Sequence, residues 1–308
     1  MGTVHRLLEA KGKQGALQLG SLDRCEVEAA AGYLADEDVG IGFLYSGWCQ
    51  AALPHRRLPD DEIWQVRGER VVLLVEPGVR VVAEGRPVPV GVPYGSRARL
   101  ILLYLQSEAL CTGSREVELG GSLRAWLTRL GISVGGKSYN AVRDQAERIA
   151  RFRLTFHVTA GATTGLVNQN IVDSALFLEA NDDAQGSRFV ERARLGEGFF
   201  EQLERHAVPL EEAAVRAVSN NSMALDAYAW LAYRLHSLPS SRSVSWRALR
   251  GQFGAGFARS DNFRTHFSSS LRLALAVYPA ARVDLEEGGL ILHPSRPPVV
   301  PKKRLARR

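Results

Sequence analysis

Two stretches of this sequence have the same order of predicted elements, and this repetition constrains the fold more than any other feature. In residues 96–178 apolar spacing predicts helix, short strand, helix, turn, helix and hairpin. Ser96, Ser122 and Ser138 stand where the three helices should begin, because a serine hydroxyl can cap a helix N-terminus. The strand is expected at Arg115–Leu119, and the hairpin at Phe152–Thr159 and Leu166–Leu178 around the Gly161–Gly165 turn.

The same order is predicted again near the C-terminus. Aromatic residues at helical spacing predict a long helix over Met223–Leu238 and a second helix over Trp246–Phe253, with a short strand at Ser243–Ser245 between them. A third helix should begin at Asp261, which can cap it, and run to Tyr278 before Pro279. Arg282–Leu285 and Gly289–His293 should form a closing hairpin. Three helices with a helix-turn-helix and a C-terminal hairpin are typical of a winged helix.

We therefore expect an α+β protein with tandem winged-helix domains and a β-rich N-terminal segment. Val-rich runs bounded by Gly and Pro predict short strands before residue 93. The predicted boundaries give an N-terminal segment 1–93 for scaffolding or dimerisation, winged-helix domains 94–198 and 199–300, and a basic tail 301–308. Within the second of these domains, Phe199–Ser219 should be a helical connection.

Composition limits the class of protein. With 45% hydrophobic and 23% charged residues the chain should fold, and it lacks an apolar run of the roughly 20 residues that a membrane helix needs. No signal peptide is recognisable, so we expect a cytoplasmic protein without membrane contact. Cys25, Cys49 and Cys111 are scattered and have no histidine at ligand spacing, so neither a disulfide framework nor a metal site is predicted.

The charge is unevenly distributed along the chain. The net charge is −3 over residues 1–93, +2 over 94–200 and +7 over 201–308, where five Lys and Arg residues follow Pro301. A basic C-terminal third suits phosphates. Within the tail, Lys302, Lys303 and Arg304 are candidate DNA contacts, although an ordinary solvated tail has the same composition.

The third helix of each repeat carries the candidate reading residues, because in a helix-turn-helix this helix enters the major groove. In the first repeat they are Lys137, Ser138, Asn140 and Arg143, with Arg148 and Arg151 on the face opposite Val142 and Ile149. In the second repeat an outward face that is small, polar and basic is expected. Its members are Asn262, Thr265, Ser269 and Arg272, flanked by Arg259 and Arg264. The alternative interpretation of both faces is a solvated helix surface.

The two wings differ in charge. Thr159–Gly165 is small and uncharged and is expected to touch DNA, whereas Glu286–Gly288 is acidic and should be repelled by phosphate.

Enzymatic alternatives are weaker. Gly131, Gly136, Lys137 and Ser138 match the phosphate-loop pattern G-x-x-x-x-G-K-S, but that loop must follow a strand, and Ser122–Leu130 is predicted to be helical. The seven histidines include no H-x-H or HExxH pair for a metal-dependent nicking reaction, and no activated nucleophile is apparent. We expect no catalytic residue and no cofactor.

The sequence resembles the RepA-like plasmid replication initiators with a conserved C-terminal RepA region. The resemblance rests on GFLYSGWCQAALPHRRLPDDEIW at 42–64, VPYGSRARLILLYLQSEAL at 92–110, REVELGGSLRAWLTRLGI at 115–132, RDQAERIARFRLTF at 143–156 and LDAYAWLAYRLHSL at 225–238. It implies binding to repeated sites (iterons) in double-stranded plasmid origin DNA, help in origin opening, and recruitment of the host initiator and replicative helicase. It also implies repression of the protein's own promoter as a homodimer. A winged-helix transcriptional regulator without initiation activity is the alternative.

Overall fold

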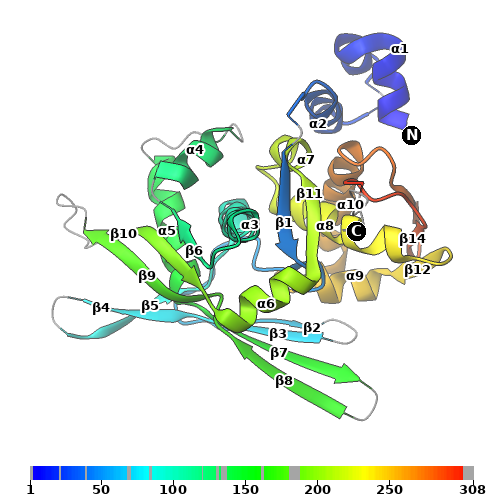
Figure 1. The fold of residues 1–308 in the computed structure, drawn as a ribbon. Coiled ribbons are helices and arrows are strands. Elements are labelled where there is room, and N and C mark those ends of the chain that lie inside the picture. The colour runs from blue at the N-terminus through cyan, green and yellow to red at the C-terminus, as the bar shows by residue number, and fades with distance from the viewer. Residues whose placement is uncertain are drawn as a thin grey trace, which may run out of the picture.

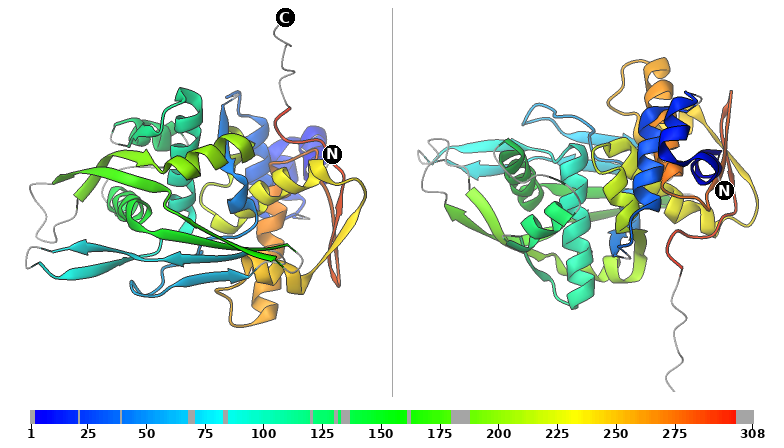
Figure 2. Two further views of the ribbon diagram at one scale, coloured as in Figure 1. Left: turned by 60° about the horizontal axis from the view of Figure 1, so that its bottom comes forward. Right: turned by 90° about the horizontal axis from the view of Figure 1, so that it is seen from above.

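The computed structural model describes residues 3–20, 22–38, 40–67, 71–82, 85–119, 121–129, 132, 137–160, 163–179 and 188–300. Helices and antiparallel sheets are mixed along this part of the chain, which confirms the α+β class (Figure 1). Figure 2 shows the N-terminal helices beside the C-terminal elements. Among the described residues, none of the helices has the length and apolar character needed to cross a membrane.

The first two elements are helices, α1 (Thr3–Gln18) and α2 (Arg24–Leu34), so the expectation of a β-rich N-terminal segment is wrong for this part of the chain. The Asp23 carboxylate caps α2 by accepting a hydrogen bond of 2.8 Å from the Cys25 backbone N–H. Gly12 kinks α1 with a φ of 64°, a conformation that glycine adopts readily. This break in the helical pattern hides α1 from an analysis of apolar spacing.

Two strands of residues 41–91 pair with strands from later in the chain. β1 (Ile41–Tyr45), followed by the short helix η1 (Ser46–Cys49), pairs with β11 (Ala207–Glu211). β2 (Trp64–Arg67) and β3 (Val71–Glu76) join β7 (Arg153–Ala160) and β8 (Thr163–Gln169) in a sheet of order β2-β3-β7-β8. β4 (Gly78–Val81) and β5 (Pro87–Gly91) pair with each other in a separate two-stranded sheet. Residues 1–93 are therefore built into the rest of the molecule.

The first repeated unit has the expected helices α3 (Gly95–Thr112), α4 (Gly121–Arg129) and α5 (Lys137–Arg151), with strand β6 (Glu116–Glu118) after α3. The expected hairpin forms between β7 and β8, which pair antiparallel, but it joins β2 and β3 in one sheet and does not close the first unit. The strands that join β6 are β9 (Val172–Glu179) and β10 (Arg188–Leu195), in the order β6-β10-β9. Arg192 lies opposite Glu118 and Arg194 opposite Glu116, and such opposite charges stabilise cross-strand pairing.

The connection between the two units is not a continuous helix. α6 (Glu197–His206) ends where β11 begins, and α7 (Glu212–Ala217) follows that strand. Pro209 lies in the middle of β11, where its missing N–H and fixed φ disfavour a helix interior. The expected helical link over Phe199–Ser219 is therefore wrong in its central part.

The second repeated unit follows the predicted order closely. It consists of α8 (Ser222–Arg234), η2 (Leu235–Ser237), β12 (Arg242–Ser245), α9 (Trp246–Phe253), α10 (Ser260–Ala276), β13 (Arg282–Glu286) and β14 (Gly289–His293). Its strands are ordered β12-β14-β13, so the first strand pairs with the last, as β6 pairs with β10 in the first unit. Side chains of Asn221 and Ser245 cap α8 and α9. Asp261 does not cap α10, whose N-cap residue is Arg259.

Candidate nucleic-acid interface

The outward face of α10 is the most complete candidate surface. Its inner residues Phe263, Phe267 and Leu271 are buried, as the helical spacing predicts. Every candidate residue on the other side is exposed: Arg259, Asn262, Arg264, Thr265, Ser269 and Arg272. Asp261 is also exposed and lies 3.4 Å from Arg259, so the start of the helix is less purely basic than expected.

The two ends of this face have different surroundings. α2 packs against α10, and the charge of Arg272 acts on Glu26 of α2. The pKa of Glu26 is raised, because burial outweighs the opposing effect of the positive charge on Arg272. At the far end of α10, Nε2 of His5 is 2.9 Å from the Ala276 carbonyl oxygen. The N-terminal half of α10, with Asn262, Arg264 and Thr265, is therefore the half that is farther from these contacts.

A core of aromatic rings holds α9 and α10 in place. Trp246 packs edge to face against both Phe263 and Phe267, with centroids 6.4 and 6.3 Å apart, a favourable geometry. The Arg264 guanidinium lies over the Trp246 ring, 5.6 Å from its centroid. Trp246 thus both supports α10 from below and orients one of its arginines.

The turn between α9 and α10 is fixed by Arg250. Its guanidinium donates to the carbonyl oxygens of Phe257 and Ala258, at 3.0 and 3.1 Å, and to the Ser260 hydroxyl, at 2.9 Å. These contacts satisfy loop carbonyls that would otherwise lack partners. α10 therefore begins directly after a turn that Arg250 holds with three hydrogen bonds.

The corresponding surface of the first unit is smaller than predicted. On α5, Asn140 is exposed and Ser138 is half-buried, with its hydroxyl 3.4 Å from Arg97. Arg143 is only 6% exposed and Arg148 only 2%. The prediction that Arg148 lies on an outward face is wrong, and Arg143 does not lie at the surface either.

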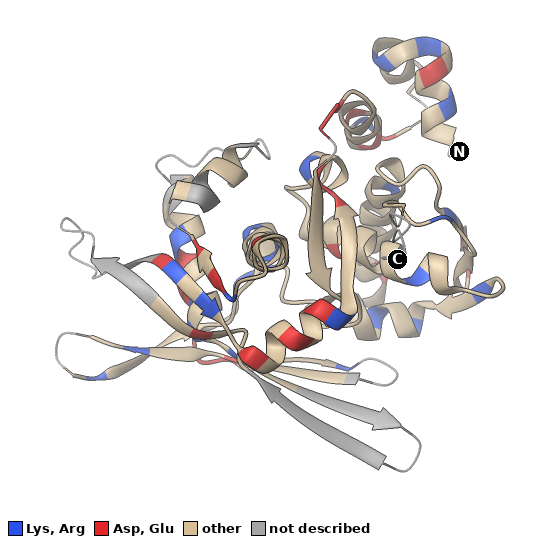
Figure 3. Cartoon of the chain, in the orientation of Figure 1, with Lys and Arg blue, Asp and Glu red and all other residues tan. Residues whose placement is uncertain are grey.

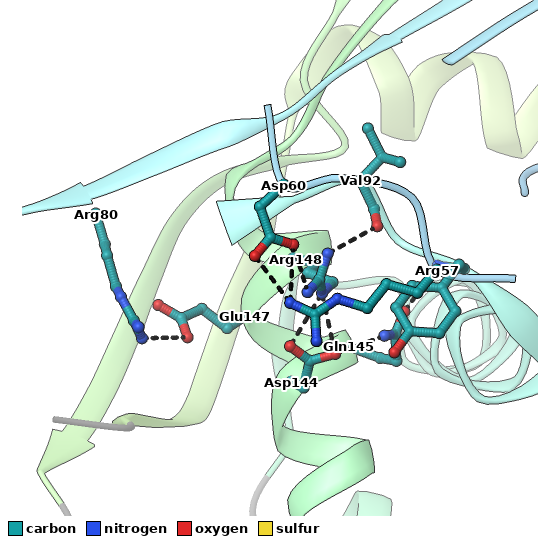
Figure 4. Close-up of polar contacts among 9 residues, drawn as sticks. Arg57, Asp60, Arg80, Val92, Asp144, Gln145, Glu147 and Arg148 are labelled. Carbon is teal, nitrogen blue, oxygen red and sulfur yellow. Dashed lines mark hydrogen bonds and ion pairs between the residues drawn. The ribbon is translucent and has the colours of Figure 1, made fainter. Parts of the chain in front are cut away.

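Arg148 is the centre of a buried polar cluster (Figure 4). Its guanidinium donates to Asp144 at 3.0 Å, to Asp60 at 3.1 Å and to the Val92 carbonyl at 3.3 Å. It also lies over the Tyr94 ring, 5.3 Å from the centroid. The loop that carries Asp60 and the strand end before Val92 thus cover this side of α5, which spacing along the helix could not indicate.

Arg151, the last candidate on α5, is also engaged. It forms an ion pair of 3.2 Å with Glu147. Arg80 of β4 approaches the same carboxylate at 3.4 Å (Figure 4). A hydrogen bond of 3.1 Å joins Arg151 to the Val79 carbonyl. These contacts fasten α5 to β4.

Several predicted contacts lie outside the described residues. They are the side chain of Lys137, the Gly161–Ala162 tip and the side chains around it, and the tail residues Lys302, Lys303 and Arg304. In the first unit the chain between β9 and β10 at residues 180–187 also lies outside them. The acidic tip of the second hairpin, Glu286–Gly288, is exposed as expected.

The segment before the G-x-x-x-x-G-K-S pattern is helix α4, not a strand. It therefore lacks the preceding strand of a nucleotide-binding loop. The described cysteines are free, with Cys49 buried and Cys25 and Cys111 exposed. Within the described ranges, His, Cys, Asp and Glu form no group of three arranged to hold a metal ion.

Sequence analysis missed three arginines near the α9–α10 turn. Arg247 on α9 is exposed, Arg250 is half-buried, and Arg67 comes from β2, far away in the sequence. All three line one cleft with Arg264. Figure 3 shows basic residues on α9, which are arginines, and no Asp or Glu there. The sequence of α9, WRALRGQF, has two arginines and no acidic residue, and this pattern could have indicated Arg247 and Arg250. No sequence pattern indicates Arg67.

Comparisons with known proteins agree with the fold and the motifs. A search of curated proteins finds no match. Among solved structures, 83% of the chain superposes on a crystal structure of domains 2 and 3 of RctB, with a TM-score of 0.53, 12% identity and 99% of that chain covered. A second structure of RctB domains 2–3 gives a TM-score of 0.47 at 11% identity, over 80% of this chain and 94% of the other. The first of these likenesses shows a shared fold.

The family described as plasmid encoded RepA protein matches residues 92–248, which run from the start of α3 into α9. The match spans the first unit, the connecting elements and the first half of the second, and therefore confirms the resemblance read from the sequence motifs. The chain belongs to the family of plasmid-encoded RepA proteins.

Proposed function

We propose that this protein is a plasmid replication initiator that binds double-stranded origin DNA through two winged-helix units. Membership of the RepA family supports the initiator role. The topology supports the two units, because β6-β10-β9 and β12-β14-β13 repeat the same strand order, and each sheet accompanies three helices in the same succession. A hairpin beside a helix-turn-helix is the arrangement of a winged helix.

The exposed N-terminal half of α10 carries the proposal. Asn262, Arg264 and Thr265 offer amide, guanidinium and hydroxyl groups to a groove edge, and the hydrogen-bonded turn behind them fixes their direction. Asn and Arg side chains can read adenine and guanine in the major groove. In the first unit, Ser138 and Asn140 remain the described candidates.

We also propose that the protein binds DNA without catalysing a reaction on it. The family implies iteron binding, opening of the adjacent DNA, contact with the host initiator and helicase, and dimeric repression of its own promoter. We propose these roles together, in the cytoplasm and without a cofactor.

Footprinting on the DNA that flanks the gene tests the proposal. Two reading units in one chain predict protected direct repeats, each covering about two helical turns. Protection of a single short palindrome would instead support a transcriptional regulator. Nucleotide hydrolysis or a covalent DNA adduct would contradict a purely binding role.

A matched pair of variants tests the role of α10. Arg264→Ala should weaken binding and lower the slope of log K against log salt by about one unit, since each phosphate contact releases counterions. Arg205→Ala on α6 removes the same charge from a helix whose exposed neighbours are Glu201 and Glu204, which would repel DNA. It should leave the slope unchanged. If Arg264→Ala keeps the wild-type slope, as the control does, α10 does not belong to the DNA interface.

A further inference from the structure

A basic cleft lies between the end of strand β2 and the α9–α10 turn. It has a volume of about 900 Å³ and is lined by Arg67 on the β2 side and by Arg247, Arg250 and Arg264 on the helical side. Neither Asp nor Glu occurs among its lining residues in the described part of the chain, which leaves out residues 68–70. Four positive charges thus share one concave surface without a neutralising carboxylate in its described lining.

Three of these arginines are available to a ligand. Arg67, Arg247 and Arg264 are exposed, and within the described residues none of them forms an ion pair or a polar hydrogen bond. Arg264 instead lies over the Trp246 ring. Other arginines of the protein are used differently, since Arg99 and Arg148 are buried against carboxylates. Arg67, Arg247 and Arg264, unlike Arg250, are therefore not used to hold the described part of the fold together.

Strand β2, on one side of the cleft, packs closely against helix α9 on the other side. A Cβ added to Gly251 of α9 would lie 2.9 Å from the Arg67 carbonyl oxygen, so glycine permits the close approach of strand and helix. Nearby, Arg56 donates a hydrogen bond of 3.3 Å to the Gly256 carbonyl and lies over the Phe257 ring. The position of Arg67 is thus set by packing between residues almost 200 positions apart.

We propose that this cleft is a phosphate clamp for the DNA backbone, in which the N-terminal segment contributes Arg67 opposite Arg247 and Arg264. Guanidinium groups bind phosphate oxygens in a bidentate manner, which suits the exposed Arg67, Arg247 and Arg264. DNA is the indicated source of the phosphate because Arg264 belongs both to the cleft and to the outward face of α10. A DNA strand whose phosphates bind in the cleft would continue along the groove that α10 is proposed to contact. The inference rests on the proposed function.

The clamp predicts a DNA contact in a segment whose net charge of −3 argues against one. Net charge averages over many residues, whereas a phosphate responds mainly to charges within about 8–10 Å at moderate salt. The acidic majority of residues 1–93 therefore does not prevent Arg67 from binding phosphate.

The test uses the full-length protein and the duplex site defined by footprinting. Affinity is measured over a range of salt for the wild type, Arg67→Ala, Arg67→Lys and the control Arg205→Ala. Arg67→Ala should lower the salt slope by about one unit, Arg67→Lys should preserve it, and Arg205→Ala should leave it unchanged. Ethylation interference should lose one blocking phosphate in Arg67→Ala only.

The possible outcomes separate this inference from the proposed function. If the wild type shows no salt-dependent binding to the duplex, the proposed function fails. If the wild type binds and Arg264→Ala lowers the slope, but Arg67→Ala keeps the wild-type slope and the full set of blocking phosphates, the clamp alone is overturned. Arg67 is exposed and has no polar partner among the described residues, so thermal unfolding of Arg67→Ala should match the wild type and confirm that the variant is folded.

Discussion

The ion pair between Arg99 and Asp226 joins the first helices of the two units, and its loss should be costly. Both side chains are nearly buried, at 9% and 11% exposure, and two contacts of 2.6 Å connect them. Arg99 also donates to the carbonyl oxygens of Leu53, Pro54 and Gly95. Asp226→Ala leaves a buried guanidinium without its counter-charge, which costs about 3–5 kcal/mol.

That cost converts into a measurable shift in thermal unfolding. With an unfolding entropy of about 2.1 cal/mol/K per residue over 308 residues, it lowers the Tm by about 5–8 °C. Asp284→Ala is the matched control, because Asp284 pairs with His293 at the surface and is 65% exposed. An exposed pair contributes less than about 1 kcal/mol, so the control should shift the Tm by less than about 2 °C.

A double-mutant cycle tests the pairing itself. Arg99→Met should cost less in the Asp226→Ala background than in the wild type, because the charge left unpaired by the first change is removed by the second. Calorimetry on the four proteins measures the coupling. A Tm for Asp226→Ala within 2 °C of the wild type, or additive effects of the two changes, would refute the assignment of Arg99–Asp226 as the buried connection between the units.

Two further predictions follow from buried and strained positions. Burial lowers the pKa of His55, whose ring contacts Ser222 and the Phe253 carbonyl, to about 4. Since the unfolded chain binds this proton near pH 6.5, the stability contributed by neutral His55 is complete above that pH and is lost as the pH falls toward 4. Denaturant unfolding from pH 4 to 7 should show a weaker pH dependence for His55→Gln, and an identical dependence would contradict the prediction. Gly91 and Gly85 both have positive φ, but a Cβ at Gly91 would lie 2.0 Å from Nη1 of Arg148, whereas Gly85 has no neighbour within 4 Å. Gly85→Ala should therefore cost about 1–2 kcal/mol from the backbone alone, and Gly91→Ala clearly more in the same unfolding assay; equal costs would show that the Arg148 cluster tolerates displacement.

Much of the second unit could be predicted because its signals are local. The helix Trp246–Phe253 was predicted with both ends correct, since the Ser245 cap and the spacing of Trp246, Leu249 and Phe253 lie within ten residues. The inner and outer faces of α10 were also predicted correctly, because helical geometry alone decides which residues share a face.

The candidate site was predicted only in part. On α10 every proposed contact is exposed, whereas on α5 two of the arginines are buried. The difference arises because α5 is covered by the Asp60 loop and the strand end at Val92, which helical spacing cannot reveal. Arg67 was not predicted as a contact, because only tertiary packing brings it next to α9 from a distant segment of the sequence.

The sequence by itself determined the helices of the repeated units, the closing hairpin of the second unit, the polar outer face of α10, and the family to which the chain belongs. Caps, turns and helical periodicity act between near neighbours, so they can be read without coordinates. Tertiary structure alone decided that β6 pairs with β10, that Arg148 is enclosed by two carboxylates, and that Arg67 lies across a cleft from Arg264. These contacts join segments tens to hundreds of residues apart, and their energies depend on which surfaces meet when the chain packs.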